Sequence, residues 1–219
     1  MSATPPKTVF HPHTPVSWPV EGTDAHFPIR RVFCVGKNYA DHVAEMGGDA
    51  KRSTPVIFTK DAACLVADGA EIAYPPNTAD LHYEVELVAA IGPEGVWGHA
   101  VGLDMTRRDL QAAAKAKGGP WDRAKSFPDS APMGSLKAGS LMEDATISLH
   151  VNGDLRQRSE IAKMIWNVEE IIAHLREDMD LQPGDLVFTG TPAGVAAVGP
   201  RDKLIAEVSG LPTLAVSYR

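Results

Sequence analysis

The 219-residue chain has little cysteine, little excess positive charge and no long apolar run. Its two cysteines, Cys34 and Cys64, are too few for a disulfide framework or a thiolate zinc site. The net charge of −7 argues against a general nucleic-acid binder, because binding to phosphates requires a basic surface. No apolar run approaches the roughly 20 residues of a membrane span, and the N-terminus has no apolar signal core. We therefore expect a cytoplasmic protein with neither nucleic acid nor a membrane as a partner.

The pattern of apolar residues predicts a β-rich α+β fold. Residues 1–28 contain six of the 17 prolines and no clear period, so we expect an extended N-terminal arm there and a single domain over residues 29–219. Strands are predicted at 30–36, 55–60, 81–91, 99–105, 145–157 (a hairpin turning at Asn152-Gly153), 185–190, 202–208 and 213–218. Helices are predicted at 38–48, 106–117 and 167–179, with Asn38, Thr106 and Asn167 as N-terminal caps. The strands outnumber the helices and do not alternate regularly with them, which favours α+β over a βαβ arrangement.

The segment LHYEVELVAAIG (81–92) places two carboxylates in what looks like a buried strand. Side chains alternate between the faces of a strand, so Glu84 and Glu86 point the same way, roughly 7 Å apart. One interpretation is an edge strand with a solvated polar face. The other is a buried strand, favoured by the apolar run 88–91, whose carboxylates need a compensating cation. Two carboxylates alone do not fill the shell of a hard cation such as Mg²⁺.

Further polar residues could complete such a site. Asp104 ends a predicted strand and supplies a third carboxylate, although a loop acid or a helix cap is the alternative. Arg108 and Gln111 share one face of the helix that follows, which suits an anionic, oxygen-rich ligand. His82 has the strand parity of the two glutamates. We interpret it as a packing or supporting residue, because an all-oxygen ligand set fits Mg²⁺ or Mn²⁺ better.

His42 and Glu45 lie three residues apart on the short helix predicted at 38–48, and so on one face. A carboxylate that orients an imidazole raises its basicity, and such a pair can activate water. An ordinary surface pair is the alternative. The glycines that flank this helix would let it close over a site as a lid.

Six segments in this order resemble the fumarylacetoacetate hydrolase superfamily. They are VFCVGKNYADHVAEMG, PVIFTKDAACL, LHYEVELVAAIG, AVGLDMTRRDLQAAAKAKGGPWDRAKSFPDSAPMG, VNGDLRQRSEIAKMIWNVEEII and LQPGDLVFTGTPAGV. The resemblance runs from the strand at 30–36 to the C-terminus and is strongest for the small acylpyruvate and fumarylpyruvate hydrolases. It implies a mixed β-sandwich roll of the family's C-terminal-domain type, with 29–219 as the catalytic domain, usually in a homodimer.

The resemblance also implies roles for individual residues. Glu84, Glu86 and Asp104 match the carboxylate ligands of Mg²⁺ or Mn²⁺, while His42 and Glu45 match a water-activating dyad on a mobile lid.

Four more positions match residues that face the substrate. Lys125 matches a catalytic lysine, Arg108 and Gln111 match substrate-binding residues in the pocket, and Thr191 matches a carboxylate-binding loop. One departure concerns the connection between Glu86 and Asp104, which has 17 residues here and is longer in relatives.

The activity that the resemblance implies is metal-dependent hydrolysis of a 2,4-dioxo acid, an acylpyruvate, to pyruvate and a carboxylic acid. Fumarylpyruvate fits best, and its second carboxylate would need a further cation, for which Lys37, Arg123 and Lys125 are candidates. Oxaloacetate decarboxylation and keto–enol or dienoate isomerisation could use the same metal site. From another class, a non-enzymatic β-roll with a structural divalent cation, or an interaction domain without metal, would have no need of the His42–Glu45 pair.

Overall fold

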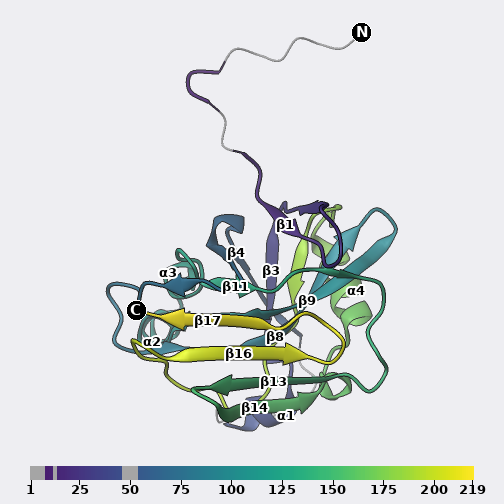
Figure 1. Cartoon of the computed structure of the whole chain (residues 1–219). Helices are drawn as coiled ribbons and strands as arrows, with labels where there is room; N and C mark the ends of the chain where they lie inside the picture. The colour runs from purple at the N-terminus through teal and green to yellow at the C-terminus, as the bar shows by residue number, and fades with distance from the viewer. Residues whose placement is uncertain (1–7, 12–13, 46–53) are drawn as a thin grey trace.

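The computed structural model describes residues 8–11, 14–45 and 54–219, and these form two large β-sheets, two small two-stranded sheets and few helices (Figure 1). The larger sheet has eight strands. Seven follow one another in the order β4 (Val56–Lys60), β3 (Val32–Gly36), β15 (Leu186–Phe188), β8 (Val85–Gly92), β9 (Gly95–Leu103), β11 (Ala131–Met133) and β5 (Leu65–Ala67), and β12 (Lys137–Ala138) pairs with β9. The pairs β15–β3 and β11–β5 are parallel and the others antiparallel, so the sheet is mixed.

The smaller sheet has five strands, and four of them lie side by side across the front of Figure 1. Its order is β14 (Asp154–Glu160), β13 (Thr146–Val151), β16 (Lys203–Val208), β17 (Leu214–Tyr218) and β6 (Glu71–Ile72). Buried and exposed residues alternate along β16, as in a sheet with one face on the core and one face in water. The predicted hairpin turn is confirmed: Asn152 and Gly153 both have positive φ, at 54° and 87°.

Strand β8 lies in the interior of the larger sheet, between β15 and β9, and all eight of its residues are buried. Val85 and Leu87 belong to the apolar cluster that faces the smaller sheet, whereas Val88 and Ala90 belong to a second cluster on the opposite face. The edge-strand interpretation of residues 81–91 is therefore wrong, and the buried-strand interpretation is confirmed. The short connection after Glu86 is a hairpin in which Gly92 pairs with Gly95.

The described helices are α1 (Ala40–Glu45), α2 (Arg108–Ala116), α3 (Asp122–Lys125) and α4 (Val168–Asp178), with 3₁₀ turns at Ala62–Cys64 and Ile161–Lys163. The cap predicted for α4 is confirmed, because Asn167 and Glu170 each accept a hydrogen bond from the other's backbone N–H. Its apolar stripe, which includes Ile171 and Leu175, packs into the main core.

Two predicted helix caps are wrong, and in each case the residue pairs with segments that are distant in the sequence. The Asn38 side chain donates to the carbonyls of Trp166 (2.9 Å) and Thr189 (2.7 Å), and it accepts from Trp166 N–H, so it ties three segments together. Thr106 belongs to β10 (Thr106–Arg107), which pairs with β7 (Leu81–His82), and α2 begins only at Arg108. Tertiary pairing outweighs local capping propensity at both positions.

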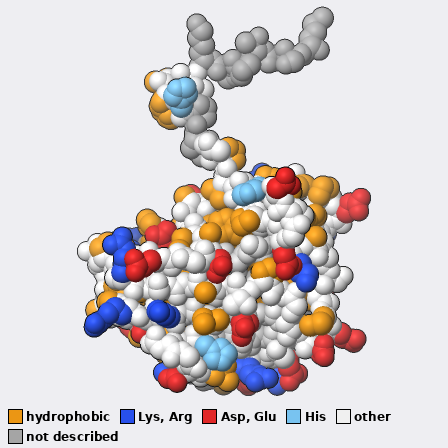
Figure 2. Space-filling model, viewed as in Figure 1, with side chains coloured by type: hydrophobic (Ala, Val, Ile, Leu, Met, Phe, Trp, Pro, Cys, Tyr) orange, Lys and Arg blue, Asp and Glu red, His pale blue; other side chains and the backbone are white. Residues whose placement is uncertain are grey.

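Part of the segment predicted as an arm packs on the larger sheet. Strands β1 (Ser17–Pro19) and β2 (His26–Pro28) form a hairpin, and Trp18 and Phe27 are buried in the second apolar cluster. The division at residue 28 stays a prediction. None of the described helices is long and apolar enough to cross a membrane. On the face shown in Figure 2, acidic and basic side chains are interspersed.

Candidate functional site

The β8–β9 hairpin brings the three predicted carboxylates together. Glu86 lies in β8, Glu84 immediately precedes that strand, and Asp104 immediately follows β9. Because Val85 pairs with Leu103, Asp104 lies opposite Glu84, and its N–H donates to the Glu84 carbonyl at 2.9 Å. One carboxylate oxygen from each of the three residues lies within 4.8 Å of the others, and all three residues are buried.

Two of the carboxylates are neutralised by cationic side chains. Lys125 Nζ donates to Glu84 Oε2 at 2.7 Å and to Asp104 Oδ2 at 2.6 Å, and Arg108 Nη2 donates to Glu84 Oε1. Burial acts to raise the pKa of the Glu84 carboxyl, but the charges of Lys125 and Arg108 outweigh it and hold this pKa well below its usual range. Burial likewise acts to lower the pKa of Lys125, yet Asp104 and Glu84 raise it, so the lysine stays protonated.

Glu86 lacks such a partner among the residues that the structure describes. Its Oε2 accepts a hydrogen bond from Gly190 N–H at 2.8 Å, and no described lysine or arginine lies within ion-pair distance. Burial, followed by the charges of Asp104 and Glu84, raises the pKa of its carboxyl well above the usual range. A further cation beside Glu86 would remove this penalty.

The residues present fit a divalent cation. Within the described ranges, Asp104 Oδ1 is buried and accepts no hydrogen bond, although Lys60 Nζ lies 2.9 Å away. The uncompensated charge of Glu86 and the free lone pair of Asp104 Oδ1 are the features that a bound cation would satisfy. Three carboxylates form an all-oxygen ligand set, which suits Mg²⁺ or Mn²⁺.

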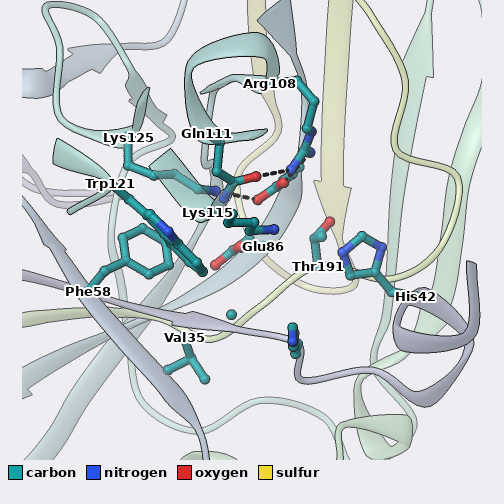
Figure 3. Close-up of a pocket in the computed structure, with 13 residues that line it drawn as sticks. Val35, His42, Phe58, Glu86, Arg108, Gln111, Lys115, Trp121, Lys125 and Thr191 are labelled. Carbon is teal, nitrogen blue, oxygen red and sulfur yellow. Dashed lines mark hydrogen bonds and ion pairs between the residues drawn. The ribbon is translucent and has the colours of Figure 1, made fainter. Parts of the chain in front are cut away.

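The cluster lies at the base of a pocket (Figure 3), and most of the predicted site residues line it. The lining residues include two of the carboxylates and five other predicted residues: Glu84, Glu86, His42, Arg108, Gln111, Lys125 and Thr191. Asp104 lies behind them, in contact with Lys125, and Glu45 lies behind His42.

His42 and Glu45 form the predicted pair on α1. Nδ1 of the buried His42 lies 3.4 Å from Glu45 Oε2, and the Glu45 carboxylate also accepts from Gly194 N–H at 3.2 and 3.3 Å. Gly194 has φ 96°, and a Cβ on it would lie 2.1 Å from the Arg156 carbonyl oxygen, so this amide depends on glycine. The glycines at 47 and 48, on which the lid prediction partly depends, lie outside the described residues.

Arg108 and Gln111 contact each other as their spacing predicts, with Arg108 Nη1 donating to Gln111 Oε1 at 2.7 Å. His82 lies outside the carboxylate cluster. Its Nε2 is 2.7 Å from Asp80 Oδ1, and its Nδ1 faces Arg108 Nε at 3.4 Å, so it supports the arginine.

Gln157, which is not among the residues predicted from the sequence, connects Thr191 with the carboxylate strand. Gln157 Nε2 donates to Thr191 Oγ1 at 2.9 Å, and Gln157 Oε1 accepts from Val85 N–H at 3.0 Å. It is the only buried residue of β14. A polar side chain at the inward position of a hairpin strand was the available signal.

Lys60 was also missed. It ends β4, is buried, and its Nζ contacts Asp104, the Met105 carbonyl at 3.2 Å, Ser130 Oγ at 3.1 Å and the Lys125 carbonyl. A lysine closing an apolar strand (PVIFTK) could have indicated a buried acidic partner.

The sequence profile that describes the fumarylacetoacetate (FAA) hydrolase C-terminal family matches residues 31–217. The chain belongs to this family. It is 46% identical to a fumarylpyruvate hydrolase from Ralstonia sp, with 73% of this chain and 90% of the relative aligned. It is 39% identical to the mitochondrial oxaloacetate tautomerase of Homo sapiens, with 83% of this chain and 88% of the relative aligned.

A solved structure of a family member has the same fold. The crystal structure of fumarylpyruvate hydrolase from Pseudomonas aeruginosa in complex with Mn²⁺ and pyruvate superposes with a TM-score of 0.93 at 47% identity. The superposition covers 97% of this chain and 99% of the other. The family and the β-rich fold predicted from the sequence are therefore confirmed.

Proposed function

We propose that this family member is a divalent-metal-dependent hydrolase that cleaves a 2,4-dioxo acid, with fumarylpyruvate as the preferred substrate, to pyruvate and a carboxylic acid. The observation that carries the proposal is one pocket lined by Glu84 and Glu86 of the buried carboxylate triad and by His42 of the His42–Glu45 pair. The similarity to the Ralstonia and Pseudomonas aeruginosa fumarylpyruvate hydrolases supports this choice of substrate.

Glu84, Glu86 and Asp104 would hold the metal ion, Mg²⁺ or Mn²⁺. A divalent cation there supplies positive charge against the negative charge that develops at the 2-oxo acid end of the substrate. The Mn²⁺ named in the Pseudomonas aeruginosa complex supports a divalent cation in this family.

His42 acts as the general base in this proposal. Glu45 accepts a hydrogen bond from Nδ1, which leaves the unprotonated Nε2 to remove a proton from water. The water oxygen forms a bond to C4 of the substrate, and the C3–C4 bond breaks. Its electron pair remains with the pyruvate fragment, which takes a proton at C3, while the acyl fragment leaves as a carboxylic acid.

Lys125, Arg108, Gln111 and Thr191 bind and polarise the substrate. Lys125, whose pKa is raised by Asp104 and Glu84, serves as a hydrogen-bond donor to the oxygen at which charge develops. The guanidinium of Arg108 and the amide of Gln111 present donors to substrate oxygens, and the Thr191 loop faces them from β15.

Oxaloacetate tautomerisation is the second candidate, supported by the human tautomerase. It requires proton transfer at the carbon between two carbonyl groups and no attacking water. This reaction would therefore not need the His42–Glu45 pair to activate water. Decarboxylation of oxaloacetate would use the same metal site.

The test is a panel of substrates given to the purified protein with Mn²⁺, with Mg²⁺ and with EDTA. We expect metal-dependent release of pyruvate from fumarylpyruvate and, more slowly, from acetylpyruvate. Conversion of oxaloacetate alone, by tautomerisation or loss of CO₂, would contradict the hydrolase assignment. The homodimer implied by the resemblance stays a prediction, which light scattering tests.

A further inference from the structure

The pocket is lined by two lysines that the proposed mechanism does not use, Lys37 and Lys115. Lys115 shares one face of α2 with Arg108 and Gln111, at the spacing i, i+3, i+7. Seven residues of helix advance about 10 Å, so this face extends along the pocket from Arg108, which contacts Glu84, to Lys115. Figure 3 shows Lys115 among the residues that line the pocket.

Lys37 occupies a backbone position that normally favours glycine. Its φ is 63°, in the left-handed region, at the turn between β3 and α1. A lysine kept in such a strained conformation indicates that its side chain contributes something that glycine could not. The same turn leads into the helix that carries His42.

These lysines leave part of the pocket with unbalanced positive charge. Arg108 and Lys125 are paired with Glu84, whereas within the described ranges neither Lys37 nor Lys115 has a carboxylate at ion-pair distance. Burial, and then repulsion from Arg108, Lys37 and Lys125, lowers the pKa of Lys115. A carboxylate placed between the two lysines would relieve this repulsion.

Aromatic side chains form the wall beside these cations. The rings of Phe58 and Trp121 lie 5.8 Å apart between centroids, and Lys115 Nζ lies 5.0 Å from the Trp121 ring. The indole thereby holds the ammonium group at the pocket wall. Flat rings at this position suit a planar, conjugated chain better than a bulky branched one.

We propose that Lys115 and Lys37 form a second anion subsite, which binds the distal carboxylate of a dicarboxylic acylpyruvate while Phe58 and Trp121 pack on the planar chain between its two ends. This proposal rests on the proposed function and deepens it, because it attributes the preference for a diacid over a substrate with a neutral acyl group to Lys115 and Lys37. Arg123, which the sequence analysis also considered as a cation for the second carboxylate, does not line the pocket.

The test compares kcat/KM for fumarylpyruvate and for acetylpyruvate, which lacks the distal carboxylate. Lys115→Met and Lys37→Met should each lower kcat/KM for fumarylpyruvate by about tenfold, mainly through KM, and leave acetylpyruvate within about twofold. Lys115→Arg should retain most of the preference. Lys117→Met removes a charge at the C-terminal cap of the same helix, outside this pocket, and is the matched control.

A binding measurement separates this inference from the proposed function. Calorimetry should detect binding of fumarate but not of crotonamide, which has a chain of the same length and no carboxylate, and both lysine substitutions should abolish the fumarate signal. If the wild type hydrolyses neither substrate, the proposed function fails, and this measurement still decides the subsite. Equal losses for both substrates, an equal effect of Lys117→Met, or equal binding of fumarate and crotonamide would overturn the subsite.

Discussion

Lys60 Nζ lies 2.9 Å from Asp104 Oδ1, and both side chains are almost completely buried. The lysine also donates to the carbonyls of Met105 and Lys125 and to Ser130 Oγ, so it fixes the segments that surround the site. Asp104 thus contacts two ammonium groups, those of Lys60 and Lys125. This arrangement lets a carboxylate stay charged in the interior without a solvent-exposed face.

Replacing Lys60 by methionine should destabilise the protein strongly. The substitution keeps the volume but leaves Asp104 with one cation and removes a donor from two buried carbonyls, so we expect a loss of about 3–5 kcal/mol. Urea denaturation measures it. Lys137→Met is the control, because Lys137 faces Glu21 at 3.7 Å on the surface and should change stability by less than about 1 kcal/mol. Similar losses for the two variants would show that Lys60 is not a structural cation.

Glu86→Gln should abolish the response to metal without unfolding the protein. Burial and the charges of Asp104 and Glu84 raise the pKa of Glu86. At pH values above the usual pKa of a glutamate, this residue therefore destabilises the folded state. A neutral amide removes that penalty and should leave the metal-free protein at least as stable as the wild type. Thermal unfolding with and without Mn²⁺ tests this, since a ligand at 100 times its Kd adds about 2.7 kcal/mol.

The control for this variant is Glu94→Gln, which makes the same change at an exposed residue of the β8–β9 turn. It should keep the full rise in Tm with Mn²⁺. An undiminished rise in Glu86→Gln would exclude Glu86 as a metal ligand.

Gly190→Ala should disturb the site through the backbone. Gly190 has φ 100°, its N–H donates to Glu86, and a Cβ would lie 2.6 Å from Asn38 Cβ. We expect a loss of about 2–3 kcal/mol and weaker metal binding, because strain and a steric clash add. Gly69→Ala separates the two causes, since Gly69 has φ 79° but a Cβ added there would have no neighbouring atom within 4 Å. Strain alone should lower the stability of that variant by about 1 kcal/mol. Equal losses in denaturation would remove the clash from the explanation.

The sequence predicted the features that depend on short-range patterns. The capping box of Asn167 and Glu170 and the turn at Asn152-Gly153 are complete within a few residues. The carboxylates were found because a strand fixes side-chain parity, and the hairpin then necessarily returns close to Glu84. The family resemblance contributed the roles of Lys125 and Thr191, which no spacing rule supplies.

What the sequence left out depends on contacts between distant segments. Asn38 is of a residue type that often caps helices, yet its side chain forms hydrogen bonds with residues 166 and 189. Lys60 meets Asp104 across 44 residues of chain, and Gln157 meets Val85 across 72, so the local pattern can mark each residue as polar and buried but cannot identify its partner. Such pairings become visible only when the order of strands in the sheets is known.

The most direct test of the account is the rate of fumarate release from fumarylpyruvate by the wild type and by His42→Ala, with Mn²⁺ present. Loss of a general base should lower kcat by at least about 100-fold while the rise in Tm with Mn²⁺ is unchanged, because His42 is not among the proposed ligands. His150→Ala, which alters a histidine of β13 outside the pocket, should match the wild type. Fumarate release by His42→Ala at the wild-type rate would contradict the central claim that this pocket hydrolyses its substrate through His42.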